Sequence, residues 1–144
     1  MWPFRRSPRP GPDPQTRQAA SDASLGRRGE DLAARHLKKH GLKILARNYR
    51  CPVGEADIIA LDTSTRKDCG AETIAIVEVK TRSSDAYTDP ASAVNADKQR
   101  RMRKVARYYL AGRDAADFNV RFDVVSIVAR QGQDPDVRHI PGAF

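Results

Sequence analysis

The amino-acid sequence, 144 residues long, predicts one α/β domain built around a mixed β-sheet. Two segments carry apolar residues at helical spacing. Three strand-like apolar segments follow the first of them, and a fourth follows the second. The connections between the first three strands are short, which favours an antiparallel meander. The predicted order is therefore helix, three strands, helix, strand.

The first predicted helix begins near Leu25 and is stopped by Gly41. Either Ser21 or Ser24 could cap its start. Its core-facing positions recur every three to four residues, at Leu25, Leu32, Ala33, His36 and Leu37. Residues 1–23 hold five prolines, four arginines and little that could be buried. They are expected to form a disordered basic arm ahead of a domain over residues 24–130.

The three following strands are expected over residues 42–50, 55–62 and 73–80. The segment "CPVG" supplies a turn between the first two, and the polar segment 63–72 connects the second to the third.

A loop over residues 82–92 leads to the second helix, with Asn95 as its expected cap and Gly112 as its end. Its apolar stripe consists of Met102, Val105, Ala106, Tyr109 and Leu110. The last strand, "VRFDVVSIVA", is apolar enough to be central, and its Asp123 is expected to form a structural ion pair with Arg121 or a helix arginine. Residues 131–144 are expected to form a weakly structured tail.

Composition narrows the range of functions. The formal net charge is +8, which fits a polyanionic partner such as nucleic acid, although a merely soluble basic protein would share it. No apolar run approaches the roughly 20 residues of a membrane span, and no secretory signal is recognisable at the N-terminus. We therefore expect a cytoplasmic protein with no membrane partner. Cys51 and Cys69 lack CxxC spacing and are expected to be reduced thiols.

Three charged residues interrupt the predicted buried strands. Alternation places Glu78 and Lys80 on one face of the third strand and Asp57 on a face of the second, together with Glu55. If the hairpin brings Asp57 beside Glu78, two carboxylates and an ammonium group converge at the rim of the core.

Two carboxylates that close repel each other unless a cation lies between them. Oxygen ligands alone favour Mg²⁺ or Mn²⁺, which would polarise a phosphodiester and activate a water molecule. Lys80 could orient that water or stabilise charge developing on the phosphorus centre. The simpler reading of Asp57, Glu78 and Lys80 is a surface ion-pair network at the end of a strand.

The same residues carry a family resemblance. The D-x(20)-E-V-K pattern within an αβββαβ order resembles the PD-(D/E)xK superfamily, which implies a restriction-endonuclease-like core with a mixed β-sheet flanked by helices. The segments "RRGEDLAARHLKKHGLKILARNYRCPVGEADIIALD", "IVEVKTRS", "AVNADKQRRMRKVARYYL" and "RFDVVSI" more closely resemble the YraN-like family of predicted nucleases, which is similar to archaeal-type Holliday-junction resolvases. The superfamily's leading proline is replaced here by Ala56.

The resemblance implies roles for four residues. Asp57 and Glu78 match the metal-binding acids, Lys80 matches the catalytic lysine, and Glu30 matches an acid on the first helix. The neighbouring Asp31 is the alternative to Glu30. Helical geometry separates them, because Asp31 lies on a solvated face where it can pair with Arg35, four residues on, whereas Glu30 lies at the margin of the buried stripe. Glu55 is a possible accessory residue that could instead anchor the turn.

The second helix carries most of the predicted nucleic-acid-binding residues. They are Arg82, just beyond Lys80, and Lys98, Arg100, Arg101, Arg103 and Lys104 on the helix itself. Such a run is usually only a solvated face, but acidic partners are scarce nearby, which favours phosphate contacts. Gln99 could either reach toward the site or serve the first turn of the helix.

Two functions therefore compete at the level of sequence. The first is a Mg²⁺- or Mn²⁺-dependent endonuclease that hydrolyses phosphodiester bonds in DNA, with branched or structured DNA as one substrate. The second is a non-catalytic nucleic-acid-binding or adaptor protein that retains the nuclease fold. The resemblance to resolvases also implies a possible homodimer.

Overall fold

The computed structural model describes residues 13–83 and 94–144, so residues 1–12 of the expected arm and most of the expected loop over 82–92 lie outside it. The elements, in chain order, are α1 (Pro14–Lys39), β1 (Lys43–Cys51), β2 (Gly54–Asp62), α2 (Thr65–Cys69), β3 (Glu72–Arg82), α3 (Ala96–Leu110), the 3₁₀ turn η2 (Ala115–Asp117), β4 (Phe118–Val128) and β5 (Asp136–Ile140). No helix within these two described ranges is both long enough and apolar enough to cross a membrane.

The five strands form one mixed sheet in the order β1-β2-β3-β4-β5. The first three are antiparallel neighbours, as predicted from their short connections. β4 runs parallel to β3, because the chain crosses over through α3 between them, and β5 pairs antiparallel with β4. The succession α1, β1, β2, β3, α3, β4 is the predicted αβββαβ core, consistent with a restriction-endonuclease-like fold.

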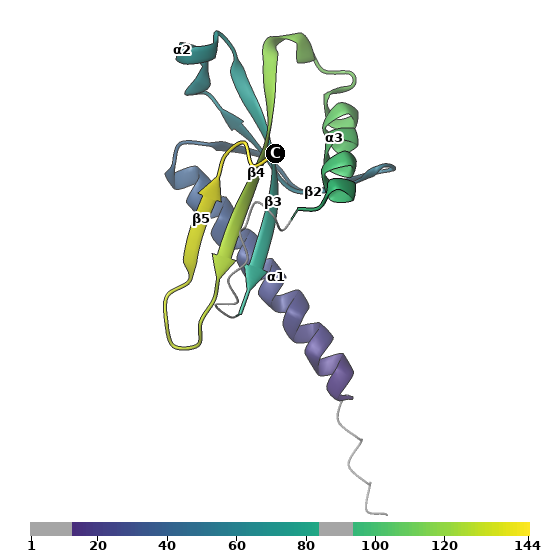
Figure 1. Ribbon diagram of the computed structural model, residues 1–144, viewed down its shortest axis with the longest axis vertical. Helices are drawn as coiled ribbons and strands as arrows, with labels where there is room; N and C mark the ends of the chain where they lie inside the picture. The colour runs from purple at the N-terminus through teal and green to yellow at the C-terminus, as the bar shows by residue number, and fades with distance from the viewer. Residues whose placement is uncertain (1–12, 84–93) are drawn as a thin grey trace, which may run out of the picture.

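The two long helices cover different sides of the sheet (Figure 1). Alternation along the strands creates two cores. One core packs Leu37 of α1 against Ile58 and Val77, and the other packs Met102 of α3 against Ile59 and Ile76. The strands that lie between the helices are therefore buried on both faces, so a charged residue at their ends borders both cores.

Helix α1 begins earlier than predicted. The expectation of disorder over residues 1–23 is wrong for residues 14–23, which form the first turns of the helix. Asp13 caps this end, accepting a hydrogen bond from the N–H of Gln15 at 3.2 Å, and Pro14 occupies the first helical position. Neither predicted serine is the cap. These first turns extend beyond the sheet (Figure 1), so no buried stripe marked them in the sequence.

The two other corrections concern short elements. The polar segment 63–72 contains the helix α2, which ends at Gly70 with a positive φ of 72°. The tail over 131–144 is not weakly structured, because it contains β5 and ends with Phe144 stacked on Phe122, with ring centroids 5.3 Å apart. A five-residue edge strand has little pattern of its own, and its stability comes from pairing with β4.

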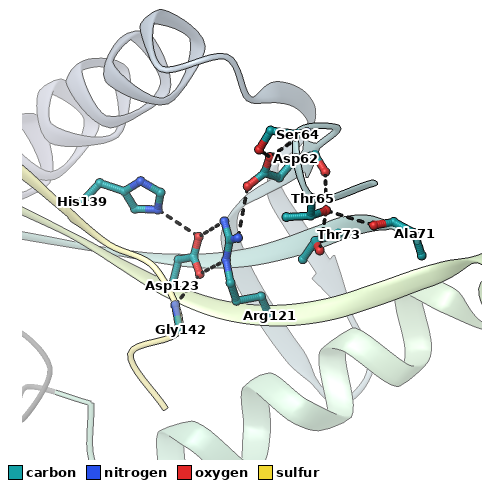
Figure 2. A network of polar contacts seen from close by, with 9 residues as sticks. All are labelled: Asp62, Ser64, Thr65, Ala71, Thr73, Arg121, Asp123, His139 and Gly142. Carbon is teal, nitrogen blue, oxygen red and sulfur yellow. Dashed lines mark hydrogen bonds and ion pairs between the residues drawn. The ribbon is translucent and has the colours of Figure 1, made fainter. Parts of the chain in front are cut away.

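A buried polar network holds this C-terminal segment to the sheet (Figure 2). Asp123, whose side chain is 0% exposed, accepts two hydrogen bonds from Arg121, as the sequence indicated. It also contacts a ring nitrogen of His139 at 2.9 Å and accepts from the N–H of Gly142 at 3.0 Å. Burial alone would raise the pKa of Asp123, but these hydrogen bonds outweigh it and lower the pKa. This ion pair is structural and lies apart from the predicted catalytic residues.

Candidate active site

The predicted catalytic residues line one open pocket of about 480 Å³ between the two helices, at the end of the sheet. Its walls come from α1, from the start of β2, from the end of β3 and from the start of α3. Its charged lining residues include Glu30, Glu55, Asp57, Glu78, Lys80 and Lys98. All four residues predicted as catalytic are thus brought together, with the accessory Glu55 among them.

Strand geometry places Asp57 beside Glu78. The β2–β3 ladder ends at the pair Ile58–Val77, so the next position on each strand is one of the two acids. Beyond that pair, the Asp57 side chain provides the hydrogen-bond acceptor in place of a backbone carbonyl. Its Oδ2 accepts a hydrogen bond from the N–H of Val79 at 2.8 Å. The carboxylate therefore fixes the end of the ladder while remaining half-buried in the pocket wall.

Glu78 lies between two ammonium groups. Its side chain is 6% exposed, with Oε1 lying 3.1 Å from Lys80 Nζ and Oε2 lying 3.2 Å from Lys98 Nζ. Oε2 is nevertheless buried without a well-aligned hydrogen bond, so the Lys98 contact is an ion pair by distance only. A buried carboxylate oxygen with no directed donor can still accept a ligand.

The electrostatics of Asp57 reflect this crowding. Burial raises the pKa of its carboxyl group, and the neighbouring Glu78 carboxylate raises it further, to about 7. The hydrogen bond from Val79 and the charge of Lys98 oppose the rise, while Glu30 adds to it. Because all three carboxylates line the same pocket, a cation bound there would be stabilised.

Glu30 reaches this environment because α1 packs unusually close to β3. A Cβ atom added at Gly29 would lie 1.9 Å from Thr81 Oγ1, so only glycine allows the observed approach. Thr81 follows Lys80 directly, and Glu30 follows Gly29. The contact therefore sets the position of the helical acid relative to the strand that carries Glu78 and Lys80.

The chemistry of the donor set fits a hard divalent cation held by Asp57 and Glu78. Within the described residues no three His, Cys, Asp or Glu side chains lie close enough to hold a metal alone, so Glu30 is not a third ligand in this conformation. Mg²⁺ is commonly bound by one or two carboxylates and keeps several waters. The Oε2 atom of Glu78, which accepts no hydrogen bond, and the repulsion around Asp57 match that mode.

The structure separates the predicted basic residues into groups. Lys98 enters the pocket, and Arg101 lies exposed on the same side of α3. Arg100 forms an ion pair with Asp97, and Arg103 lies over the rings of Phe122 and Phe144, which gives it a packing role. Lys104 is exposed.

Three other side chains lie elsewhere. Arg82, at the end of β3, is half-buried and does not line the pocket. Gln99 donates to the carbonyl of Val94 at 3.0 Å, which is the helix-start role and not the reach toward the site. Asp31 is exposed as predicted, but the expected pairing with Arg35 is wrong: its carboxylate pairs with Arg47 of β1 at 2.6 Å, because that edge strand runs beside α1.

The chain matches a protein family and several relatives over most of its length. A family model described as "Uncharacterised protein family UPF0102" matches residues 29–127. The chain belongs to the UPF0102 family. A UPF0102 protein of Geobacter metallireducens is 47% identical over 121 residues, which cover 84% of this chain and 92% of the relative. Those of Mycobacterium ulcerans and Syntrophotalea carbinolica are 43% and 46% identical, covering 82% and 84% of this chain and 92% and 91% of the relatives.

Two features of this UPF0102 site were missed by sequence reasoning. The first is the ion pair between Lys98 and Glu78, which joins a residue predicted only as a phosphate contact to the catalytic carboxylates. Its position three residues after Asn95, before the apolar stripe begins, was the available signal. The close approach at Gly29 had no signal beyond a glycine inside a helix, a residue that usually destabilises one.

Because the pKa of Asp57 is raised in the folded protein, the free energy of unfolding should depend on pH. Without divalent metal, Asp57→Asn is expected to stabilise the UPF0102 chain at pH 8 by up to about 4 kcal/mol. Asparagine removes the repelled charge and still accepts from Val79. The folded pKa lies above the unfolded value of 3.8, so the wild type loses stability as pH rises from about 4 to about 7. Urea denaturation in EDTA across this range should show the two proteins diverging.

The same variant provides the control. Below pH 4 both proteins carry a neutral side chain at this position, so their stabilities should converge. Adding Mg²⁺ at pH 8 should stabilise the wild type and leave Asp57→Asn nearly unchanged. Equal stabilities at pH 8 without metal would show that the carboxylates are not in repulsive contact.

Proposed function

We propose that this UPF0102 protein is a metal-dependent endonuclease that hydrolyses phosphodiester bonds in DNA. The observation that carries the proposal is the convergence of Glu30, Asp57, Glu78 and Lys80 in one open pocket. The resemblance of the D…EVK hairpin to the PD-(D/E)xK nucleases supports it, as does the net charge of +8. Branched DNA is the substrate form suggested by the resemblance to junction resolvases.

Each residue has a part that follows from its position. Asp57 and Glu78 would hold Mg²⁺ or Mn²⁺, which supplies charge neutralisation at the phosphate and a more acidic bound water. Lys80 lies 3.1 Å from Glu78, so its ammonium group stands at the metal-binding edge and can hold the attacking water or offset charge on the phosphoryl oxygens. Lys98 supplies a second positive charge to the same wall.

Glu30 lies across the pocket from these groups, on α1. Its carboxylate is half-exposed and acts on Asp57 through space. From there Glu30 can orient a water molecule that is not bound directly to the metal ion, or it can accept a proton from that water. The site would therefore divide metal binding and water positioning between the sheet and the helix.

Cleavage of labelled DNA tests the proposal. Linear, nicked and four-way-junction DNA are incubated with the protein in Mg²⁺, Mn²⁺ or EDTA, and Asp57→Asn protein purified in the same way controls for contaminating nucleases. We expect cutting only by the wild type and only with metal, with the preferred DNA form read from the relative rates. DNA binding without any cleavage in either metal would instead support the non-catalytic alternative.

A further inference from the structure

A second pocket of about 410 Å³ adjoins the candidate active site. It is formed between the β1–β2 turn and the first half of α3. Its lining includes Arg50, Cys51, Gly54, Glu55, Lys98 and Arg101. Glu55 and Lys98 also line the first pocket, so the two pockets share a wall and form one continuous surface.

The charges of this second pocket favour an anion. Arg50, Lys98 and Arg101 contribute three positive charges against the single carboxylate of Glu55. Arg101 makes no ion pair with any side chain in the described part of the chain. Arg50 contacts Glu55 at 3.5 Å, but its side chain is 80% exposed, and such exposed pairs contribute little.

The β1–β2 hairpin fixes the backbone position of Arg50. Arg50 pairs with Glu55 in the β1–β2 ladder, and the thiol of Cys51 donates to the carbonyl of Gly54 at 3.3 Å to close the turn. A Cβ atom at Gly54 would lie 3.1 Å from a methyl group of Val105, so the turn packs directly on α3. Arg50 thus lies near the end of β1, beside a turn that packs against the helix that carries Arg101.

We propose that this pocket is a second phosphate site, in which Arg50 and Arg101 bind a backbone phosphate flanking the one that is hydrolysed. The proposal rests on the proposed function for its ligand, a nucleic-acid strand, and adds where that strand runs. The strand passes from the metal-binding edge over Lys98 and on to the β1–β2 turn. Arg100, which pairs with Asp97, and Arg103, which lies over two aromatic rings, do not line this pocket.

The salt dependence of DNA binding tests the proposal. Affinity for fluorescein-labelled duplex and single-stranded DNA is measured in EDTA over a range of NaCl for the wild type and Arg50→Ala/Arg101→Ala. Loss of this one phosphate contact should reduce the slope of log K against log salt by about 0.9 for duplex or about 0.7 for a single strand. If the lines meet near 1 M salt, affinity at 0.1 M salt falls roughly 5- to 8-fold.

A matched variant separates local contacts from net charge. Arg66→Ala/Lys67→Ala removes two charges from α2, at the opposite end of β3 from Lys80, and should leave the slope nearly unchanged. All four side chains are exposed, so none of the substitutions should alter folding. Equal effects of the two double variants, no effect of either, or no DNA binding by the wild type would overturn the proposal.

The second phosphate site and the nuclease activity can fail separately. If the wild type cuts no DNA, but Arg50→Ala/Arg101→Ala shows the predicted reduction in salt slope, the phosphate site is supported and the nuclease activity is refuted. If the wild type cuts DNA, and the double variant has the same cleavage kinetics and the same salt slope, the nuclease activity is supported and the phosphate site is refuted.

Discussion

Replacing Lys80 with methionine is expected to lower the rate of metal-dependent DNA cleavage about 10²–10³-fold, the cost of losing one positioned electrostatic group. Methionine keeps much of the side chain's length and removes the ammonium group that lies 3.1 Å from Glu78. Metal binding should persist, because both carboxylates remain and Glu78 loses a competing cation. The expected result is therefore a fall in kcat with stabilisation by Mg²⁺ retained, measured by single-turnover cleavage and thermal denaturation.

Lys98→Met is the informative comparison, because Lys98 approaches the other oxygen of Glu78 at 3.2 Å. We expect it to weaken DNA binding more than it slows the chemical step. Lys67→Met, on the exposed surface of α2, controls for the loss of one positive charge. If Lys98→Met abolishes cleavage while Lys80→Met cuts normally, the roles assigned to the two lysines are reversed.

Sequence patterns were sufficient for the parts of the fold that depend on neighbours along the chain. The stripe around Met102 and Val105 predicted α3, and Asn95 caps it as expected, accepting from the N–H of Lys98 at 2.9 Å. The short connections predicted the meander. The pairing partner of β5 and the length of α1 were not predictable in this way, because one depends on β4 and the other on a first turn with no buried side.

The candidate site divides similarly. Strand alternation was enough to place Glu78 and Lys80 together, and the hairpin register then brought Asp57 beside them. The contact between Lys98 and Glu78 joins α3 to β3, and no periodicity within either element specifies it. Helix–sheet contacts of this kind depend on the distance between the helix and the sheet. The only sign of that distance in the sequence is a scattered small residue such as Gly29.

Gly29→Ala tests that packing distance. The added methyl group would lie 1.9 Å from Thr81 Oγ1, with the Cβ and Cγ2 atoms of Thr81 at 3.1 and 3.3 Å, so a rotation of the threonine exchanges one clash for another. Helix α1 must therefore shift away from β3. We expect a destabilisation of about 1–3 kcal/mol, typical of overpacking. Displacement of Glu30 should also lower cleavage about tenfold to a hundredfold.

Two further variants distinguish this clash from a general effect of substitution in α1. Gly26→Ala lies one turn earlier with nothing within 4 Å of the added methyl group, so it should stabilise the helix by about 0.5–1 kcal/mol. Thr81→Ala removes the Oγ1 and Cγ2 atoms that oppose the new methyl group. Gly29→Ala/Thr81→Ala should therefore be more stable than the sum of the single effects, with part of the cleavage rate restored. Strict additivity in urea denaturation would show that Gly29 does not set the distance between α1 and β3, and that Glu30 is positioned by other contacts of the helix.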